Sequence, residues 1–227
     1  LNIVNFVIWL SPFGVFCLIF STFSSLGLSI IFTLINYFLI VVGVLIFHAV
    51  FTYSLLLTSL AKINPFIFFS KMKEAIIFAF STSSSSATMP VTLKIVEEKL
   101  GVDKSVSSFC IPLGTTINMD GTAIMQGVAT VFIAQVYQVD LSMMEYLMVI
   151  ITATLASIGT AGVPGVGLIM LAMVLQQVGL PVEGIALIIG VDRLLDMLRT
   201  AVNVSGDATI SCICLLYTSD AADDKCS

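Results

Sequence analysis

The chain has 227 residues, of which 58% are hydrophobic and only 10% are charged, and its mean hydropathy is +1.11. Soluble domains carry roughly 25% charged residues. The composition therefore excludes an ordinary soluble domain and indicates an all-α polytopic membrane protein, with the lipid bilayer as its surroundings. The formal net charge of −5 says little about other partners, and no nucleic-acid partner is expected.

Two long apolar runs, residues 4–20 and 33–60, come first, and each can span the roughly 30 Å hydrocarbon core as a helix. The next two apolar segments, residues 74–80 and 88–100, are too short to span, and a run of serine and threonine at 81–86 separates them. Two half-length helices joined by a polar tip predict a re-entrant hairpin. The alternative for a serine run is a flexible linker, which its place between two membrane half-helices disfavours.

The segment 106–135 is long enough to span, but a polar stretch between Gly114 and Gly121 interrupts it and contains Asn118 and Asp120. Hydrocarbon offers no hydrogen bonds, so such groups persist at membrane depth only where they line a cavity inside the protein. The stretch therefore predicts a functional site, and cations are the simplest partners for it.

A second pair of short apolar segments, residues 146–157 and 165–178, flanks a tip at 157–165 that glycine and proline keep from being helical. A last span follows at 184–214. Matching pairs of short, interrupted segments predict an inverted repeat whose binding site lies near the middle of the bilayer.

The placement of lysine predicts how the two hairpins are oriented. Lys62, Lys71 and Lys73 precede the first hairpin, whereas the connections at 136–145 and 179–183 contain neither Lys nor Arg. By the positive-inside rule, the first hairpin enters the bilayer from the cytoplasm and the second from outside. We therefore expect the two tips to meet near the middle, in a geometry suited to two gates.

The last span carries a polar stripe, because its polar residues are spaced by four, three, four and four positions on one helix face: Asp192, Asp196, Arg199, Asn203 and Asp207. Each charge costs roughly 2.5–3.5 kcal/mol at the membrane centre, so the stripe is expected to face the protein interior. A guanidinium grips a carboxylate with two parallel hydrogen bonds, and Asp196 suits an ammonium group. Together they describe an amino acid, with the serine tip donating to its second carboxylate. The alternative is a structural stripe in which Arg199 pairs with Asp196.

Three other features complete the description of the chain. His48, the only histidine, is expected to be packed or locally hydrogen-bonded rather than a proton relay.

Residues 215–227 break the pattern abruptly and resemble a translated sequencing or assembly artefact more than a solvated tail, so they are left out of the predicted fold. The first residue is Leu1, and no signal-peptide pattern follows it, which is expected if the sequence begins inside a longer protein.

Four motifs resemble those of the dicarboxylate/amino acid:cation symporters, the glutamate transporter family. They are Ser-Ser-Ser-Ala-Thr-Met-Pro at 84–90, Asn-Met-Asp-Gly-Thr at 118–122, Ala-Ser-Ile-Gly-Thr-Ala-Gly-Val-Pro-Gly at 156–165 and Asp-Met-Leu-Arg-Thr-Ala-Val-Asn-Val-Ser-Gly-Asp at 196–207. The resemblance covers residues 1–212 and corresponds to the C-terminal two-thirds of such a carrier.

The resemblance implies a glutamate-transporter-like fold with two re-entrant helical hairpins. Residues 1–26 would form a scaffold helix, and residues 27–214 would form a transport domain that slides, elevator-like, within a homotrimer. This multi-pass protein would lie in the plasma or inner membrane. The parts of the transport domain would be a spanning helix 33–60, a hairpin 66–104, a broken helix 106–135, a hairpin 143–180 and a polar helix 184–214.

The resemblance also implies a set of binding residues, carried over by motif position. The substrate would be held by Ser84, Ser85, Thr122, Val163, Gly167, Asp196, Arg199, Thr200 and Asn203. One sodium ion would be held by Gly114, Asn118, Asn203 and Asp207, and a second by Thr116, Ser157, Ile158 and Thr160. A third would be held by Asn118 and Asp120, together with residues of an earlier helix that this chain lacks.

Two positions depart from patterns known in the family. Some relatives carry an Arg where Ser83 stands here, and others carry it where Met197 stands, so one accessory positive charge of the pocket is missing. Gln126 stands where proton-coupled relatives have Glu, which argues against a co-transported proton at this position.

We therefore predict secondary active symport of L-aspartate or L-glutamate coupled to sodium, without covalent chemistry, hence neither an enzyme nor a protein with a cofactor beyond its sodium ions. Three alternatives stay open. A C4-dicarboxylate carrier would leave Asp196 without a partner. An intramembrane serine hydrolase using Ser84 or Ser85 would lack a positioned base. A truncated fragment would not function at all.

Overall fold

The computed structural model describes residues 13, 16, 17, 20, 24 and 30–223, so most of the first predicted span lies outside the described residues. Every regular element within the described part is helical, and this part contains no strand. The predicted all-α class is therefore confirmed for this part of the chain.

The first long helical run consists of three elements joined without a break. Helix α2 (Ile30–Phe47) continues through one π-helical turn, η1 (His48–Thr52), into α3 (Tyr53–Ser59). Among the described residues, Ile31–Ser59 is the one helix that is long and apolar enough to cross a membrane by length and composition.

The first hairpin is formed by α4 (Pro65–Thr82) and α5 (Ser85–Glu98). Only Ser83 and Ser84 lie between these helices, so the non-helical tip is shorter than the predicted 81–86. Ser83 takes the left-handed conformation that ends α4, and the Ser84 hydroxyl caps α5 by accepting a hydrogen bond from the amide of Ala87. The tip is short because neighbouring hydroxyls bond carbonyls of their own helix, as Ser81 does with Ile77 at 2.8 Å.

The broken helix consists of α6 (Lys104–Ile117) and α7 (Asp120–Val136). The interruption comprises only Asn118 and Met119, and is therefore narrower than the predicted stretch from Gly114 to Gly121. Both glycines lie inside helices, where they permit close approach rather than a turn.

The second hairpin is formed by α8 (Met143–Ile158) and α9 (Val166–Gln177). A reciprocal capping box between Ser142 and Glu145 starts α8. The loop between the helices ends at Gly165, whose φ of +81° suits glycine.

The last helix, α10, follows a short 3-10 turn, η2 (Val182–Gly184), and runs from Ile185 to Asp223. The structure continues this helix to Asp223, past the predicted end at 214 and into the segment that the sequence analysis left out of the fold. Leu215, the first residue of that segment, packs against the core.

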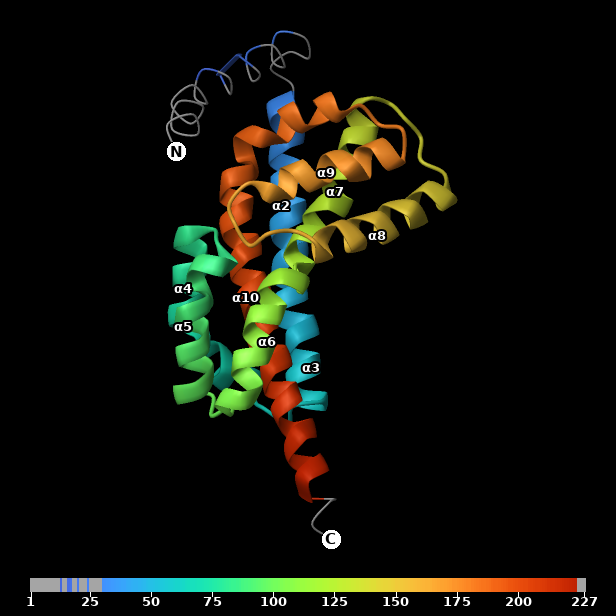
Figure 1. Cartoon of the computed structure of the whole chain (residues 1–227). Coiled ribbons are helices and arrows are strands. Elements are labelled where there is room, and N and C mark those ends of the chain that lie inside the picture. The colour runs from blue at the N-terminus through green and yellow to red at the C-terminus, as the bar shows by residue number, and fades with distance from the viewer. Residues whose placement is uncertain (1–12, 14–15, 18–19, 21–23, 25–29, 224–227) are drawn as a thin grey trace.

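Helix α10 forms the axis on which most of the other helices pack, while α8 packs on α7 and α9 (Figure 1). The core has two parts along it. One joins α2, α7, α8 and α9 to the first half of α10, and the other joins α3, α4, α5 and α6 to the second half. Both hairpin tips reach the middle of α10, where the α6–α7 interruption also lies (Figure 1).

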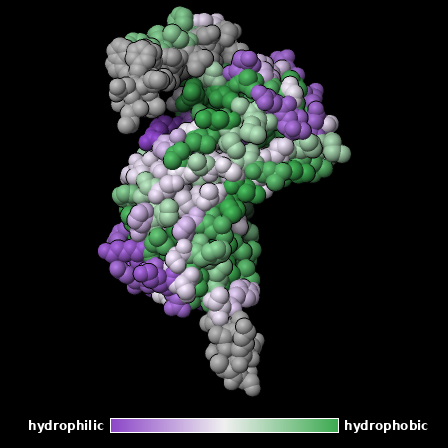
Figure 2. All heavy atoms as spheres, viewed as in Figure 1, coloured by the Kyte–Doolittle hydropathy of each residue, from purple (hydrophilic) through white to green (hydrophobic). Residues whose placement is uncertain are grey.

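On the face shown in Figure 2, hydrophobic and intermediate side chains cover most of the area, and hydrophilic side chains gather near the base of α4 and α5 and near the α7–α8 connection. Exposed apolar side chains include Phe66 and Phe32, which are 87% and 75% exposed. Such a surface fits contact with lipid or with other apolar helices.

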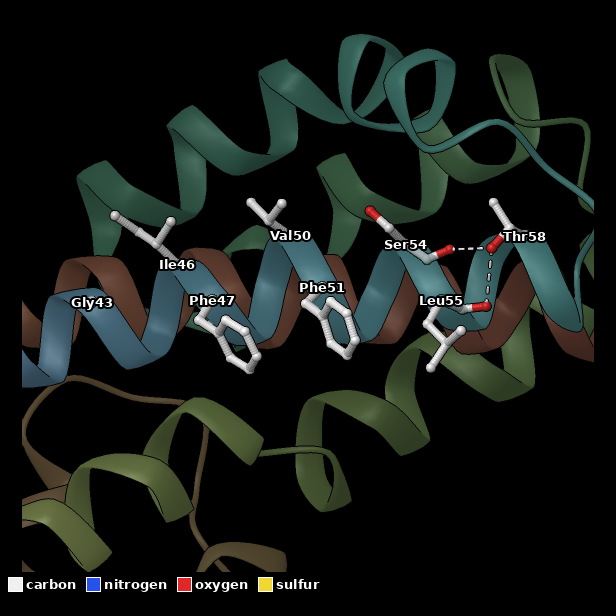
Figure 3. Close-up of a pocket in the computed structure, with 8 residues that line it drawn as sticks. All are labelled: Gly43, Ile46, Phe47, Val50, Phe51, Ser54, Leu55 and Thr58. Carbon is white, nitrogen blue, oxygen red and sulfur yellow. Dashed lines mark hydrogen bonds between the residues drawn. The ribbon is translucent and has the colours of Figure 1, made fainter.

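One face of the α2–α3 run forms an open apolar groove, in which Phe47 and Phe51 stack with ring centroids 5.2 Å apart (Figure 3). The hydroxyl of Thr58 donates to the carbonyls of Ser54 and Leu55 at 2.7 and 3.2 Å (Figure 3). This hydroxyl is therefore bonded to its own helix. Two other polar side chains of the run bond to other helices: His48 to α7, and Tyr53 to α7 and α10.

Candidate functional site

A small cavity lies where both hairpin tips and the α6–α7 interruption meet α10. Its volume is about 20 Å³, and its lining comes from all four of these parts. The lining residues are Ser83, Ser85, Met119, Thr122, Thr160, Ala161, Gly162, Val163, Gly167, Asp196, Thr200 and Asn203. Seven of the nine predicted substrate residues are in this set, and the other two, Ser84 and Arg199, contact it from behind.

Arg199 is the most deeply placed charge of the site, with only 1% of its surface exposed. Its Nη2 lies 2.9 Å from Asp196 Oδ1 and 3.0 Å from Asp192 Oδ1. The pairing of Arg199 with Asp196 that the sequence analysis named as the alternative is therefore present in this structure. Asp192 had no predicted partner, although it lies on the same stripe seven residues before Arg199.

The guanidinium is nevertheless only partly hydrogen-bonded. In the described part of the chain its Nε and Nη1 have no hydrogen-bond partner. A Cβ at Gly167 would lie 3.4 Å from Nη1 and 3.3 Å from Thr122 Cγ2. The absence of a side chain at Gly167 therefore lets this residue pack directly against Arg199 and Thr122.

The second hairpin loop is fastened to the site at two points. The amide of Gly165 donates to Asp196 Oδ2 at 3.1 Å. The carbonyl of Gly162 accepts two hydrogen bonds from the first tip, from the hydroxyl of Ser84 at 2.7 Å and from the amide of Ser86 at 3.1 Å. A Cβ at Gly162 would lie 2.9 Å from Ser86 Oγ, so only glycine allows this approach.

Asp207 lies beside the α6–α7 interruption, with 2% of its surface exposed. Its Oδ1 accepts a hydrogen bond from Asn118 Nδ2 at 3.0 Å, and a Cβ at Gly114 would lie 2.5 Å from the same oxygen. The structure thus brings together three of the four residues predicted for the first sodium site. Carboxylate, amide and carbonyl oxygens are hard donors that suit small cations.

Asn203, the fourth residue of that predicted site, lies one turn away and faces a different group. Its Oδ1 accepts from the amide of Gly121 at 2.8 Å, and its Nδ2 contacts the sulfur of Met119 at 3.2 Å. Asn203 therefore holds the start of α7 against α10.

Asp120 is surrounded by donors that the sequence analysis did not identify. Its Oδ2 accepts from Tyr53 Oη at 2.5 Å and lies 2.7 Å from His48 Nε2, while its Oδ1 accepts from the amide of Gly121 at 3.0 Å. The expectation of a packed or locally bonded His48 is half right: the ring is hydrogen-bonded, but to a residue 72 positions away.

Three of the residues predicted for the second sodium site donate to carbonyls of the helix that contains or precedes them. Thr116 donates to the carbonyl of Pro112 at 2.8 Å, Ser157 to that of Thr154 at 2.8 Å, and Thr160 to that of Ala156 at 2.8 Å. The side chain of Ile158 is exposed. Each of these hydroxyls donates its proton to a carbonyl, which leaves the lone pairs of its oxygen able to face a cation.

Comparison with known proteins gives a consistent picture. The family model described as "Sodium:dicarboxylate symporter family" matches residues 1–215. The chain is 45% identical over 210 residues to an "Excitatory amino acid transporter" of Caenorhabditis elegans, a match that covers 92% of the chain and 42% of the relative. It is 43% identical over 215 residues to "Excitatory amino acid transporter 1" of Rattus norvegicus, covering 92% and 39%. The chain spans about two-fifths of the length of these curated relatives.

Proposed function

The chain belongs to the sodium:dicarboxylate symporter family, and we propose that it is the substrate- and sodium-binding part of a carrier for acidic amino acids. The carrier moves L-aspartate or L-glutamate together with sodium through a multi-pass protein of the plasma or inner membrane. The process is secondary active transport, with no bond made or broken in the substrate.

The observation that carries this proposal is that the guanidinium of Arg199 is only partly hydrogen-bonded. Its Nε and Nη1 are buried without partners in the described structure, while its Nη2 is held by Asp192 and Asp196. A side-chain carboxylate accepts from Nη1 in parallel with Nη2 once Asp196 turns away from Nη2, the paired geometry in which arginine binds carboxylates best.

The amino group of the substrate then takes Asp196. This exchange leaves both Asp192 and Asp196 next to a cationic group, because Asp192 still faces Arg199 when Asp196 turns to the ammonium group. Breaking a buried ion pair without such compensation costs several kcal/mol, on the order of 3–5. A zwitterionic acidic amino acid therefore fits the site better than a dicarboxylate, which would leave Asp196 facing a second anion.

The size of the cavity supports a gate. A volume of about 20 Å³ holds roughly one water molecule, so an amino acid enters only after part of the lining moves. The second hairpin loop is the part we assign to this motion, because glycines at 159, 162 and 165 interrupt it and its ties to the site are hydrogen bonds.

Sodium couples to the substrate through the residues beside the cavity. Asp207, Asn118 and the carbonyl of Gly114 form one site, and Asp120 belongs to another. A cation at Asp207 compensates a buried carboxylate whose one described side-chain partner is an uncharged amide. The proposal also includes a transport domain that slides within a homotrimer. Its two hairpins enter the membrane from opposite sides and form part of an inverted repeat.

The test is uptake and binding by the purified protein in liposomes. Radiolabelled L-aspartate should accumulate when a sodium gradient is imposed, should not accumulate with choline in place of sodium, and should be displaced by L-glutamate far better than by succinate. Equal competition by succinate would favour a C4-dicarboxylate carrier, which the family description also allows. Binding that does not depend on sodium would contradict the proposal.

A further inference from the structure

The π-helical turn between α2 and α3 places two side chains on one carboxylate oxygen. The amide of Tyr53 donates to the carbonyl of His48, which closes a turn one residue wider than an α-helical one. In a regular α-helix, residues five apart point about 140° away from each other. Here His48 Nε2 and Tyr53 Oη both lie within hydrogen-bond distance of Asp120 Oδ2, at 2.7 and 2.5 Å.

The hydroxyl of Tyr53 has a second acceptor on α10. It lies 3.1 Å from the carbonyl of Val202, and this carbonyl belongs to the helical turn that carries Asn203 and Asp207. A phenol has one proton to donate, so the shorter contact with Asp120 and the longer one with Val202 compete for it.

The same hydroxyl also lies next to the residues assigned to the other sodium site. A Cβ at Gly206 would be 2.7 Å from Tyr53 Oη and 2.6 Å from Asn118 Nδ2, so both groups border one point on α10. Asn118 in turn donates to Asp207. Tyr53 therefore stands between the carboxylates of Asp120 and Asp207.

We propose that Tyr53 is a positioning residue that couples cation binding at Asp120 to the sodium- and substrate-binding turn of α10. A cation on Asp120 draws the carboxylate away from the phenol, and the hydroxyl then donates to the carbonyl of Val202. His48 keeps its hold on Oδ2 throughout and leaves Oδ1 to face the cation. This inference rests on the proposed function, because it concerns sodium and the amino acid of the same site.

A purely structural role for Tyr53 makes a different prediction. The ring packs edge-on against His48, with centroids 5.0 Å apart, and only 3% of the residue is exposed. Tyr53→Phe keeps this packing and removes only the hydroxyl. If the hydroxyl merely stabilises the fold, the variant changes stability by the same amount at every sodium concentration.

Tyr37→Phe is a matched control. Tyr37 lies on α2, is 1% exposed and packs against Phe132 with ring centroids 4.8 Å apart and ring planes tilted by 35°. Its hydroxyl has no hydrogen-bond partner in the described part of the chain, so its removal breaks no hydrogen bond to Asp120 or α10.

The experiment measures the Kd for L-aspartate across a sodium titration, for the parent protein, Tyr53→Phe and Tyr37→Phe in detergent. Tyr53→Phe should weaken aspartate binding about tenfold more at low sodium than at saturating sodium, as loss of a coupling residue does. Tyr37→Phe should follow the parent at every sodium concentration. An equal shift of Kd at all sodium concentrations, or the same shift in both variants, overturns the inference.

A second measurement separates this inference from the proposed function. The melting temperature is followed with sodium chloride or choline chloride and no amino acid, so the result does not depend on aspartate as the substrate. Sodium should raise the melting temperature of the parent and of Tyr37→Phe more than that of Tyr53→Phe. If sodium stabilises all three equally, or none of them, the coupling role is wrong. A parent stabilised by sodium that binds no aspartate contradicts the proposed substrate alone.

Discussion

The hydroxyl of Ser84 donates a hydrogen bond of 2.7 Å to the carbonyl of Gly162, and so joins the tips of two hairpins that are 78 residues apart in the chain. The amide of Ser86 donates to the same carbonyl, and the amide of Gly165 donates to Asp196. Each such hydrogen bond contributes about 1 kcal/mol, so a few bonds of this size hold the second loop closed, and the loop can open on binding.

The loop of the second hairpin should open to the outside. A Cys introduced at Val163, which is 48% exposed, should react with a membrane-impermeant thiol reagent added outside, in a background without native cysteines. L-aspartate with sodium should slow the reaction severalfold because the loop closes on them. A Cys at Val139, which is 41% exposed on the α7–α8 connection, serves as the control and should react at the same rate with or without aspartate. Reaction from the cytoplasmic side alone would reverse the predicted topology.

Arg199 should select the acidic side chain. Arg199→Cys removes a buried charge and both free donors, and should cost on the order of 2–5 kcal/mol of aspartate binding. Because the pocket keeps Asp196 for an amino group, neutral amino acids should bind in place of aspartate. Arg193→Cys is the control, since Arg193 is exposed on the same helix. Unchanged aspartate affinity in Arg199→Cys, measured by equilibrium binding, would sink the assignment.

Asp207 should hold a sodium ion. Asp207→Asn keeps the size of the side chain and removes the charge that a cation compensates, so half-maximal aspartate binding should require severalfold more sodium. Asp140→Asn, at an exposed position, should leave the sodium titration unchanged. The same sodium dependence in Asp207→Asn as in the parent would make Asp207 a structural residue only.

Gly206 should tolerate no side chain, although it lies inside a helix. A Cβ there would meet Asn118 Nδ2 at 2.6 Å and Tyr53 Oη at 2.7 Å. Ala is favoured over Gly within helices by about 1 kcal/mol, so any loss of stability in Gly206→Ala comes from this contact. We expect a lower melting temperature and weaker sodium binding.

Gly127→Ala is the control for that substitution, because Gly127 lies on α7 and a Cβ there would meet no described atom within 4 Å. It should raise the melting temperature slightly. If Gly206→Ala raises it as well, the close approach at α10 has no energetic importance.

The order and type of the helices could be predicted from the chain because hydrophobicity and glycine, proline and serine mark their ends. The lengths of the non-helical interruptions between the helices could not be predicted. Ser84 caps α5 and shortens the first tip to two residues, and the break before α7 comprises only Asn118 and Met119. Such details depend on hydrogen bonds made across the fold.

The surroundings of Asp120 show the same limit within the candidate site. A π-helical turn leaves no mark in composition, and Tyr53 looks like any aromatic residue of a membrane helix. His48 and Tyr53 are brought to Asp120 by the packing of the first helical run on α7 and α10. By contrast, the stripe on α10 could be read from its spacing, although its spacing alone could not show that Arg199 is shared between Asp192 and Asp196.

The pairing of one guanidinium with two carboxylates leaves the site with a net negative charge, which responds to the membrane voltage. Asp192 and Asp196 face Arg199, and Asp120 and Asp207 lie by the α6–α7 interruption. The four carboxylates contribute four formal negative charges and Arg199 one positive charge, so this group of five carries a formal charge of −3. Moving one elementary charge through a membrane potential of 100 mV is worth about 2.3 kcal/mol. If the cation-free site crosses the bilayer, a voltage that is negative inside drives it outward, and each bound sodium ion weakens that drive. The resting potential would thus favour the return of the unloaded carrier.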